Sequence, residues 1–217
     1  MDQEKLKYTH VIWDWNGTLL DDVGAALKSV NAMLERRGKQ PINLAQYHDY
    51  LDIPIKKFYE NIFDLEKDDY SEILKEYNDG YESQMYEISL AHGARETLNR
   101  IREAGVRQLI VSSCEQNQLN YYLKHFDLEH YFDAVLGSED FFAGSKVQRA
   151  KNYLKSENID PAMVLVVGDL VHDYEMARNI GADCVLVSIG HHSEKRLRES
   201  GAKVADSISQ ILKDDFV

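Results

Sequence analysis

Apolar residues recur at helical spacing through residues 22–90. The first run ends at the polar stretch Arg36-Arg37-Gly38 and contains Val23, Ala26, Leu27, Val30, Met33 and Leu34. The spacing predicts a helix there, and a second helix from Ile55 to Phe63. A third predicted helix has one face made of Tyr70, Ile73, Leu74, Tyr77 and Tyr81. No strand candidate interrupts this region, so the sequence predicts an all-helical segment.

Residues 91–217 have a different pattern, in which helical runs alternate with short apolar runs. The predicted strands are Leu109 to Val111, Ala134 to Leu136, Met163 to Val167 and Cys184 to Val187. A further apolar run, Val11 to Trp13, precedes the helical segment, and Lys146 to Ser156 is one of the predicted helices. Unbroken apolar strands that alternate with helices are typical of a parallel sheet covered on both faces.

The two patterns together predict an α/β protein with an insert. We expect a Rossmann-like, doubly wound parallel sheet built from residues 1–21 and 91–217. Residues 22–90 would form an inserted all-helical domain.

The acidic composition limits the partners. The formal net charge is -12 and the sequence pI is near 5.1, so nucleic acid, which requires a basic surface, is not an expected partner. The same charge is a problem for any anionic substrate. Such a substrate would need local positive charge from a metal ion, a lysine or helix N-termini.

Targeting and redox signals are scarce. No apolar stretch approaches the ~18 residues of a membrane span, and the polar N-terminus lacks the pattern of a secretory signal. We therefore expect a cytoplasmic protein with no membrane partner. The two cysteines, Cys114 and Cys184, argue against a disulfide framework.

Carboxylates follow two of the predicted strands. Asp14 comes directly after Val11 to Trp13, and Asp169 follows Met163 to Val167, with Asp173 four residues further on. Because parallel strands end at the same edge of a sheet, these side chains are expected to meet there. Taken alone, Asn16-Gly17 also predicts a two-residue hairpin, and an Asp after a strand can simply cap a helix.

Two further candidates are weak by themselves. Ser112 and Ser113 follow the strand Leu109 to Val111, and Lys146 opens a predicted helix after Gly144 and Ser145. Serines are common after strands, and a lysine at a helix start can be an ordinary surface residue. Their order along the chain gives them weight.

That order resembles the haloacid dehalogenase superfamily. Its phosphatases carry Asp-x-Asp-Gly-Thr after the first strand, then a Ser or Thr, a lysine and Gly-Asp-x3-Asp. This chain has Asp14-Trp15-Asn16-Gly17-Thr18, Ser112, Lys146, Gly168-Asp169 and Asp173 in the same order. The helical segment falls where the family has its cap. With His172-Asp173-Tyr174-Glu175, the pattern is similar to the phosphoglycolate-phosphatase-like subgroup.

The resemblance implies a Mg2+-dependent phosphatase that works through an aspartyl-phosphate on Asp14. The implied catalytic residues are Asp14, Asn16, Ser112 and Lys146. The implied substrate-binding residues are Thr18, Ser112, Ser113 and Lys146. The implied metal ligands are Asp14, the backbone carbonyl of Asn16, Asp169 and, in or near the coordination sphere, Asp173. The expected substrate is a small phosphorylated metabolite, and the expected assembly is a monomer or a homodimer.

The chain departs from the family pattern at two positions. Val147 follows Lys146 where many relatives have proline. Asn16 stands where the phosphatases carry the Asp that protonates the leaving group and then activates water, and losing such a group typically costs ~10²–10⁴ in rate. On this basis Asn16→Asp is expected to raise the turnover of alkyl phosphates.

Three interpretations follow from Asn16. The first is a phosphatase with a good leaving group, or with an acid/base group from elsewhere, such as His172 or the cap. The second is a phosphonatase-like enzyme that uses a cap lysine, for which Lys56 and Lys57 are the available residues. The third is a weakened hydrolase that binds a phosphorylated ligand for regulation.

Two sets of aromatic side chains are given ordinary roles. His191 and His192, after the last predicted strand, could face the site from a loop, but a solvated loop is the expected place for them. The tyrosines of the helical segment could line a substrate or subunit surface, but their helical spacing favours core packing; they are Tyr47, Tyr50, Tyr59, Tyr70, Tyr77 and Tyr81.

Overall fold

The computed structural model describes residues 7–139 and 146–213. Its strands are β1 (His10–Trp13), β2 (Leu20–Asp21), β3 (Ser89–Leu90), β4 (Arg107–Glu115), β5 (Ala134–Ser138), β6 (Val164–Gly168), β7 (Asp183–Val187) and β8 (Lys203–Ala205). Its α-helices are α1 (Val23–Arg36), α2 (Leu44–Tyr50), α3 (Lys56–Ile62), α4 (Tyr70–Glu82), α5 (Ala94–Glu103), α6 (Gln116–His125), α7 (Lys146–Ser156), α8 (Val171–Ile180) and α9 (Glu194–Glu199). Short 3-10 helices cover Met85–Glu87, Glu129–Tyr131, Pro161–Met163 and Ile208–Leu212.

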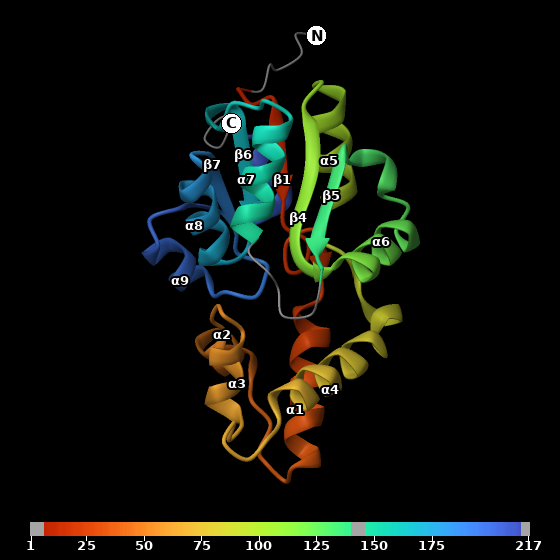
Figure 1. Ribbon diagram of the computed structural model, residues 1–217, viewed down its shortest axis with the longest axis vertical. Coiled ribbons are helices and arrows are strands. Elements are labelled where there is room, and N and C mark those ends of the chain that lie inside the picture. Colours follow the sequence, from red (N-terminus) through yellow and green to blue (C-terminus); the bar gives the residue numbers. More distant parts are fainter. Residues whose placement is uncertain (1–6, 140–145, 214–217) are drawn as a thin grey trace.

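A six-stranded parallel sheet forms the centre, in the order β5-β4-β1-β6-β7-β8. The chain runs from β1 to β4 and β5 on one side, then returns to β6 on the other side of β1. The order therefore reverses beside β1, and an open sheet has its binding crevice at such a point. Figure 1 shows β4 and β5 running toward the helical part of the molecule.

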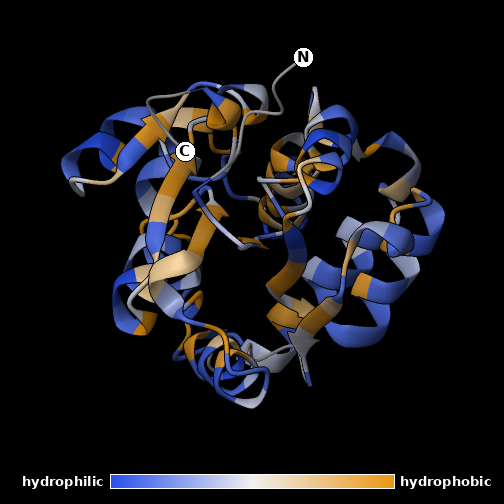
Figure 2. Cartoon of the chain, turned by 90° about the horizontal axis from the view of Figure 1, so that it is seen from above, coloured by the Kyte–Doolittle hydropathy of each residue, from blue (hydrophilic) through white to orange (hydrophobic). Residues whose placement is uncertain are grey.

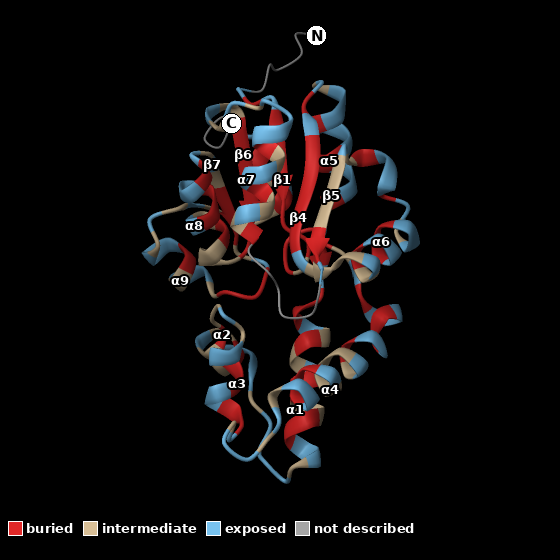
Figure 3. Ribbon diagram, viewed as in Figure 1, coloured by how far each residue is buried: buried red, intermediate tan, exposed pale blue. Residues whose placement is uncertain are grey.

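Two apolar clusters cover the two faces of the sheet. On β1, Val11 and Trp13 belong to one cluster, whereas Ile12 belongs to the other, as the alternation of a strand requires. The first cluster includes residues of α5 and α6, and the second includes residues of α7 and α8. Figure 2 shows the apolar strands inside a ring of more polar helices. Figure 3 shows β1, β4 and β6 mostly buried, whereas most of β5, at the edge of the sheet, is of intermediate burial. This arrangement confirms the doubly wound parallel sheet predicted from the sequence.

Helices α1 to α4, called here the helical insert, lie between β2 and β3 and beyond one end of the sheet (Figure 1). Helices α1, α3 and α4 begin and end close to their predicted positions. No strand interrupts the described segment between Val23 and Glu87, but two short strands border it: β2 and β3 pair antiparallel through Leu20 with Leu90 and Asp21 with Ser89. Two residues per strand are too few to show an alternating pattern.

Two other local predictions differ from the structure, and strand β8 was not predicted. Asn16-Gly17 does not turn β1 back into a hairpin, since the next strand, β2, pairs with β3. Strand β4 is longer than its apolar run and continues through Ser112 and Ser113 to Glu115. Strand β8 has only three residues, begins with a lysine at the edge of the sheet, and carries no unbroken apolar run. Among the described residues no helix is long and apolar enough to cross a membrane.

Strand β1 lies at the centre of the sheet, and its side chains are buried on both faces, so they are expected to be critical for the stability of the fold. Ile12 is fully buried against the second cluster, so Ile12→Ala leaves a cavity and should lower the free energy of unfolding by about 2–5 kcal/mol. Leu44→Ala, at a half-exposed position on α2, is the control and should change it little. Urea denaturation of both variants measures the difference, and equal effects would show that Ile12 is not part of a close-packed core.

Candidate functional site

The carboxyl ends of β1 and β6 bring three acidic side chains together. Trp13 pairs with Val167, and the Asp14 backbone N–H donates to the Val167 carbonyl at 2.8 Å. Asp169 directly follows Gly168, the last residue of β6. Asp173 lies in the first turn of α8. One carboxylate oxygen from each of Asp14, Asp169 and Asp173 lies within 4.8 Å of the others. We call these three residues the acidic cluster.

Lys146 lies inside the acidic cluster. Its Nζ is 2.7 Å from Asp14 Oδ1 and 2.6 Å from Asp173 Oδ1, and its side chain is 4% exposed. Burial on its own lowers the pKa of Lys146, but the Asp14 and Asp173 carboxylates outweigh it and raise the pKa. The lysine is therefore a cation that joins the start of α7 to the end of β1 and to the first turn of α8.

Backbone and hydroxyl donors hold the other two carboxylates in place. Asp173 Oδ2 accepts from the backbone N–H groups of Asp169 and Leu170, at 3.2 and 3.0 Å. Asp169 accepts from the Thr18 hydroxyl at 3.1 Å and from the His191 backbone N–H at 2.7 Å. The structure thus places Thr18 as a support for Asp169, and its predicted contact with substrate stays a prediction.

Three buried carboxylates around one ammonium leave an excess of negative charge. Burial raises the pKa of Asp14, while Lys146 opposes the shift. Burial also raises the pKa of Asp169 well above its ordinary value, and repulsion from Asp14 and Asp173 adds to the rise. A divalent cation would relieve this repulsion, and carboxylate oxygens are the ligands that Mg2+ prefers. The donor set therefore fits the predicted magnesium site.

The two candidate serines point to different environments. Register pairs Trp13 with Ile110, so Ser112 lies beside the first residues after β1. Ser112 is buried, and its Oγ accepts from the Cys114 N–H at 3.1 Å, whereas Ser113 is exposed. The structure favours Ser112 over Ser113 as the residue close to the acidic cluster. Gly144 and Ser145, which precede Lys146, lie outside the described residues.

A fourth buried carboxylate, Asp22, lies outside the acidic cluster and contacts the loop after β1. Its Oδ1 accepts from the Gly17 backbone N–H at 2.7 Å and lies 3.2 Å from His191 Nε2. Its Oδ2 accepts from Asn16 Nδ2 at 2.8 Å and from the Tyr81 hydroxyl at 2.5 Å. Burial alone would raise the pKa of Asp22, but His191 and these donors lower it. Asp22 is therefore an ionised partner of Asn16 and Gly17 in the loop after β1.

His191 and His192 are buried, and the expectation of a solvated loop is wrong for both. Burial lowers the pKa of His191, but Asp22 outweighs burial and raises it to about 9, so the ring is cationic. Its Nδ1 lies 2.9 Å from the Tyr47 hydroxyl on α2. His192 is neutral, because burial lowers its pKa to about 4, and its Nδ1 accepts from the Val171 N–H at the start of α8.

Sequence reasoning missed Asp22, Tyr47 and Tyr81 as part of this region. The pair Asp21-Asp22 directly before a predicted helix was a usable signal, but it resembles an ordinary helix cap. The tyrosines had helical spacing that core packing already explained. His172, a predicted acid/base candidate, lies on α8 with its Nδ1 3.8 Å from Glu175, which is mostly exposed.

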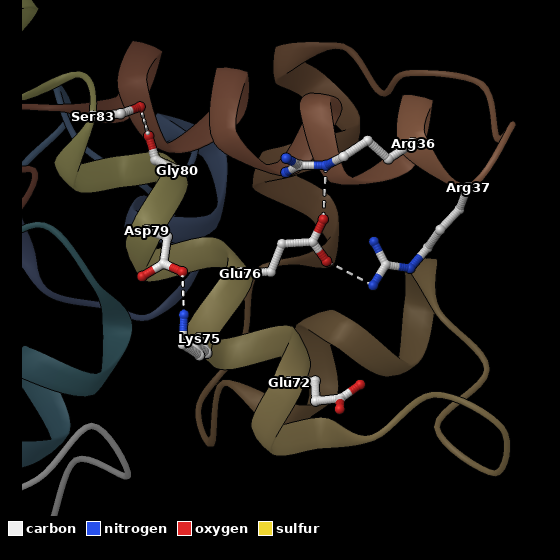
Figure 4. Close-up of a pocket in the computed structure, with 8 residues that line it drawn as sticks. All are labelled: Arg36, Arg37, Glu72, Lys75, Glu76, Asp79, Gly80 and Ser83. Carbon is white, nitrogen blue, oxygen red and sulfur yellow. Dashed lines mark hydrogen bonds and ion pairs between the residues drawn. The ribbon is translucent and has the colours of Figure 1, made fainter.

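A surface pocket on the helical insert is lined by residues of α1 and α4 and by Arg37 and Ser83 (Figure 4). Its charged side chains pair with one another: Glu76 bridges Arg36 at 2.8 Å and Arg37 at 2.7 Å, and Lys75 pairs with Asp79. None of its lining residues belongs to the acidic cluster or contacts Asp22. The acidic cluster, and not this pocket, is therefore the candidate functional site.

Gly17 permits the close approach of the loop to the acidic cluster. Its φ is +69°, and a Cβ at this position would lie 2.3 Å from Asp169 Oδ2. Gly17→Ala should therefore displace Asp169 or His191 and lower the free energy of unfolding.

Gly38→Ala is the matched control. Gly38 has φ +65°, but its surroundings are open, so alanine there carries only the backbone cost of ~1–2 kcal/mol. A larger loss at Gly17 in urea denaturation measures the steric contact alone, and equal losses would show that the loop can move away from Asp169.

Known proteins resemble this chain in family, in sequence and in fold. The model of a protein family described as "Haloacid dehalogenase-like hydrolase" matches residues 11–187 of this chain. The chain is 26% identical to a 5'-nucleotidase of Pseudomonas aeruginosa over 91% of this chain and 90% of that protein. It is 29% identical to a phosphoglycolate phosphatase of Nitrosospira multiformis over 87% of each.

A solved structure of a haloacid dehalogenase-like hydrolase from Streptococcus pneumoniae has the same fold. The TM-score is 0.83 at 19% identity, with 95% of this chain and 97% of that chain covered. The fold, the order of the motifs and the match over residues 11–187 confirm the resemblance seen in the sequence: the chain belongs to the haloacid dehalogenase-like hydrolase family.

Proposed function

We propose that this protein is a Mg2+-dependent phosphatase that acts on a small phosphorylated metabolite through a phosphoryl group carried on Asp14. One observation carries the proposal. Asp14 lies at the end of the central strand with Lys146 Nζ 2.7 Å away, inside a set of buried carboxylates that fits a divalent cation. A nucleophile, a cation for phosphate oxygens and a metal site therefore share one place.

The residues divide the work as follows. Asp14 Oδ attacks phosphorus and forms an acyl phosphate, and water later hydrolyses it. Lys146 holds a phosphoryl oxygen and keeps Asp14 oriented, and Ser112 contributes a further hydrogen bond. Asp14, Asp169, Asp173 and the Asn16 backbone carbonyl would hold Mg2+, which when bound would neutralise charge on the phosphoryl group.

The helical insert supports a small substrate. Tyr47 on α2 contacts His191, and Tyr81 on α4 contacts Asp22, so the insert rests directly on the loops around the acidic cluster. An insert in this position excludes bulk water and large substrates. The relatives are named for different phosphate esters, so the reaction class carries over and the identity of the metabolite does not.

A phosphonatase that uses a lysine of the insert receives less support. Lys56 and Lys57 are exposed, and Lys57 pairs with Asp52 at 3.1 Å. Neither residue is held near the acidic cluster by a contact among the described residues. A regulatory protein that binds phosphate without turnover is an outcome of the tests below.

Replacing the nucleophile should stop the reaction. With p-nitrophenyl phosphate and acetyl phosphate in Mg2+ buffer, Asp14→Asn should release phosphate no faster than the buffer blank, because an amide cannot form the acyl phosphate. Asp21→Asn, which removes an exposed carboxylate on β2, should keep wild-type rates. Phosphate release by Asp14→Asn at the wild-type rate would rule out Asp14 as the nucleophile.

Binding of Mg2+ should stabilise the fold independently of activity. At a hundredfold excess over the dissociation constant a ligand adds about 2.7 kcal/mol, which is a rise of about 5–10 °C in Tm for a protein of this size. Asp169→Asn should lose most of this rise, and Asp21→Asn should retain it. A Tm that is insensitive to Mg2+ in the wild type would exclude the metal site.

A further inference from the structure

Asp22 occupies the N-cap position of α1 but does not cap the helix. Its side chain accepts no hydrogen bond from the first turn of α1. The carboxylate instead turns toward the loop after β1, where Gly17, Asn16, Tyr81 and His191 surround it. A fully buried carboxylate with this many partners has one fixed orientation.

This carboxylate determines which way the Asn16 amide faces. Asn16 Nδ2 lies 2.8 Å from Asp22 Oδ2 and 3.0 Å from the Tyr81 hydroxyl oxygen. Tyr81 donates its own hydrogen to Asp22, so its oxygen accepts from the amide. The reversed amide would place its oxygen against the carboxylate, and both atoms can only accept.

The amide oxygen of Asn16 is therefore left facing away from Asp22. Within residues 7–139 and 146–213, Oδ1 of Asn16 accepts no hydrogen bond, and the residue is half-buried. An amide oxygen can accept a hydrogen bond from a water or a hydroxyl, but it gives no proton to a leaving group.

The two buried cations near the site are also committed. Lys146 bridges Asp14 and Asp173, and His191 bridges Asp22 and the Tyr47 hydroxyl through its two ring nitrogens. The third N–H of Lys146 can still hold a phosphoryl oxygen, but in the described part of the chain either cation would lose its charge beside a buried carboxylate if it gave a proton to a leaving group.

We propose that Asn16 and Asp22 are a matched pair, in which Asp22 is a positioning residue that turns the Asn16 amide and makes the site specific for phosphoryl donors that leave without a proton. Acyl phosphates and phosphoanhydrides are such donors, and alkyl phosphates are not. The proposal rests on the phosphatase function proposed above and defines its substrate class.

The chemistry balances without an acid at residue 16. The Asp14 oxygen forms a bond to phosphorus while the bond to the leaving oxygen breaks, and that oxygen departs as an anion with the electron pair. Water, held through its hydrogen by Asn16 Oδ1, then attacks the phosphoryl group. Its proton passes to a phosphoryl oxygen while the bond between phosphorus and the Asp14 oxygen breaks, which releases dihydrogen phosphate and restores the Asp14 carboxylate.

The pair also explains why Asn16→Asp alone should not gain activity. The new carboxylate would face Asp22 at the 2.8 Å that now separates amide and carboxylate, and like charges at this distance repel strongly. The sequence-based expectation of higher turnover did not include Asp22. We now expect the single variant to lose stability and activity.

Exchanging the two residues should preserve the hydrogen bonds with their polarity reversed. In Asn16→Asp/Asp22→Asn, the amide at position 22 can accept from Gly17 and His191 and donate toward position 16. Tyr81 can donate to the new carboxylate. In urea denaturation each single variant should lower the midpoint, and the double variant should recover at least half of the loss.

The decisive readout is a ratio of kcat/KM values, acetyl phosphate over ethyl phosphate. The wild type should have a high ratio. The double variant has a carboxyl group at position 16 that can protonate the leaving oxygen, so its ratio should fall by about 10²–10⁴-fold, the usual worth of a positioned acid. Asp21→Asn is the control for removing a neighbouring carboxylate and should leave both the ratio and the midpoint unchanged.

The outcomes separate this proposal from the proposed function. If the double variant still hydrolyses acetyl phosphate with an unchanged ratio of kcat/KM values, the proposed substrate class is wrong. If its loss of urea midpoint equals the sum of the losses of the two single variants, Asn16 and Asp22 are not a matched pair. If the wild type releases phosphate from neither donor, the phosphatase function and the substrate class both fail, and the midpoints still decide whether the two residues are coupled.

Discussion

The structure depends on negative charge concentrated at the carboxyl edge of the parallel sheet. Three buried carboxylates meet around Lys146, and charges in such a place are stable only when each oxygen has a partner. The partners come from several elements: Lys146 from α7, the backbone N–H groups of Asp169 and Leu170 before α8, and the Thr18 hydroxyl from the loop after β1. The charge thus fixes how the ends of β1 and β6 meet the starts of α7 and α8.

A second charged centre, Asp22 with His191, attaches the helical insert to this edge. Asp22 begins α1, and its carboxylate accepts from Tyr81 on α4, while the His191 ring reaches Tyr47 on α2. Further along, the Arg196 guanidinium contacts the Leu51 carbonyl and the Asp52 carboxylate. These polar contacts add to the apolar cluster that the insert shares with one face of the core, so the insert is held to the core by both kinds of contact.

The sequence was sufficient where a structural feature depends on local pattern or on motif order. Unbroken apolar runs predicted β1, β6 and β7, and the Asp14 and Asp169 motifs predicted which strand ends would meet. It failed where a feature depends on contacts between distant segments. Asp22 and His191 are far apart in the chain, and neither has a local pattern that distinguishes a buried ion pair from a helix cap and a polar loop. Strands β2 and β3 exist only because they pair with each other.

Residue 16 shows why a motif has to be interpreted with its three-dimensional neighbours. Compared position by position with the family's phosphatases, Asn16 is a loss, because an amide cannot protonate a leaving group. In the folded chain a carboxylate is still present 2.8 Å away, at Asp22, and it is ionised, buried and bonded to Tyr81 of the helical insert. Asn16 is the residue type that can touch Asp22 without repulsion. The character of residue 16, the charge of Asp22 and the attachment of the insert are therefore one physical problem, and a change in any of them alters the other two.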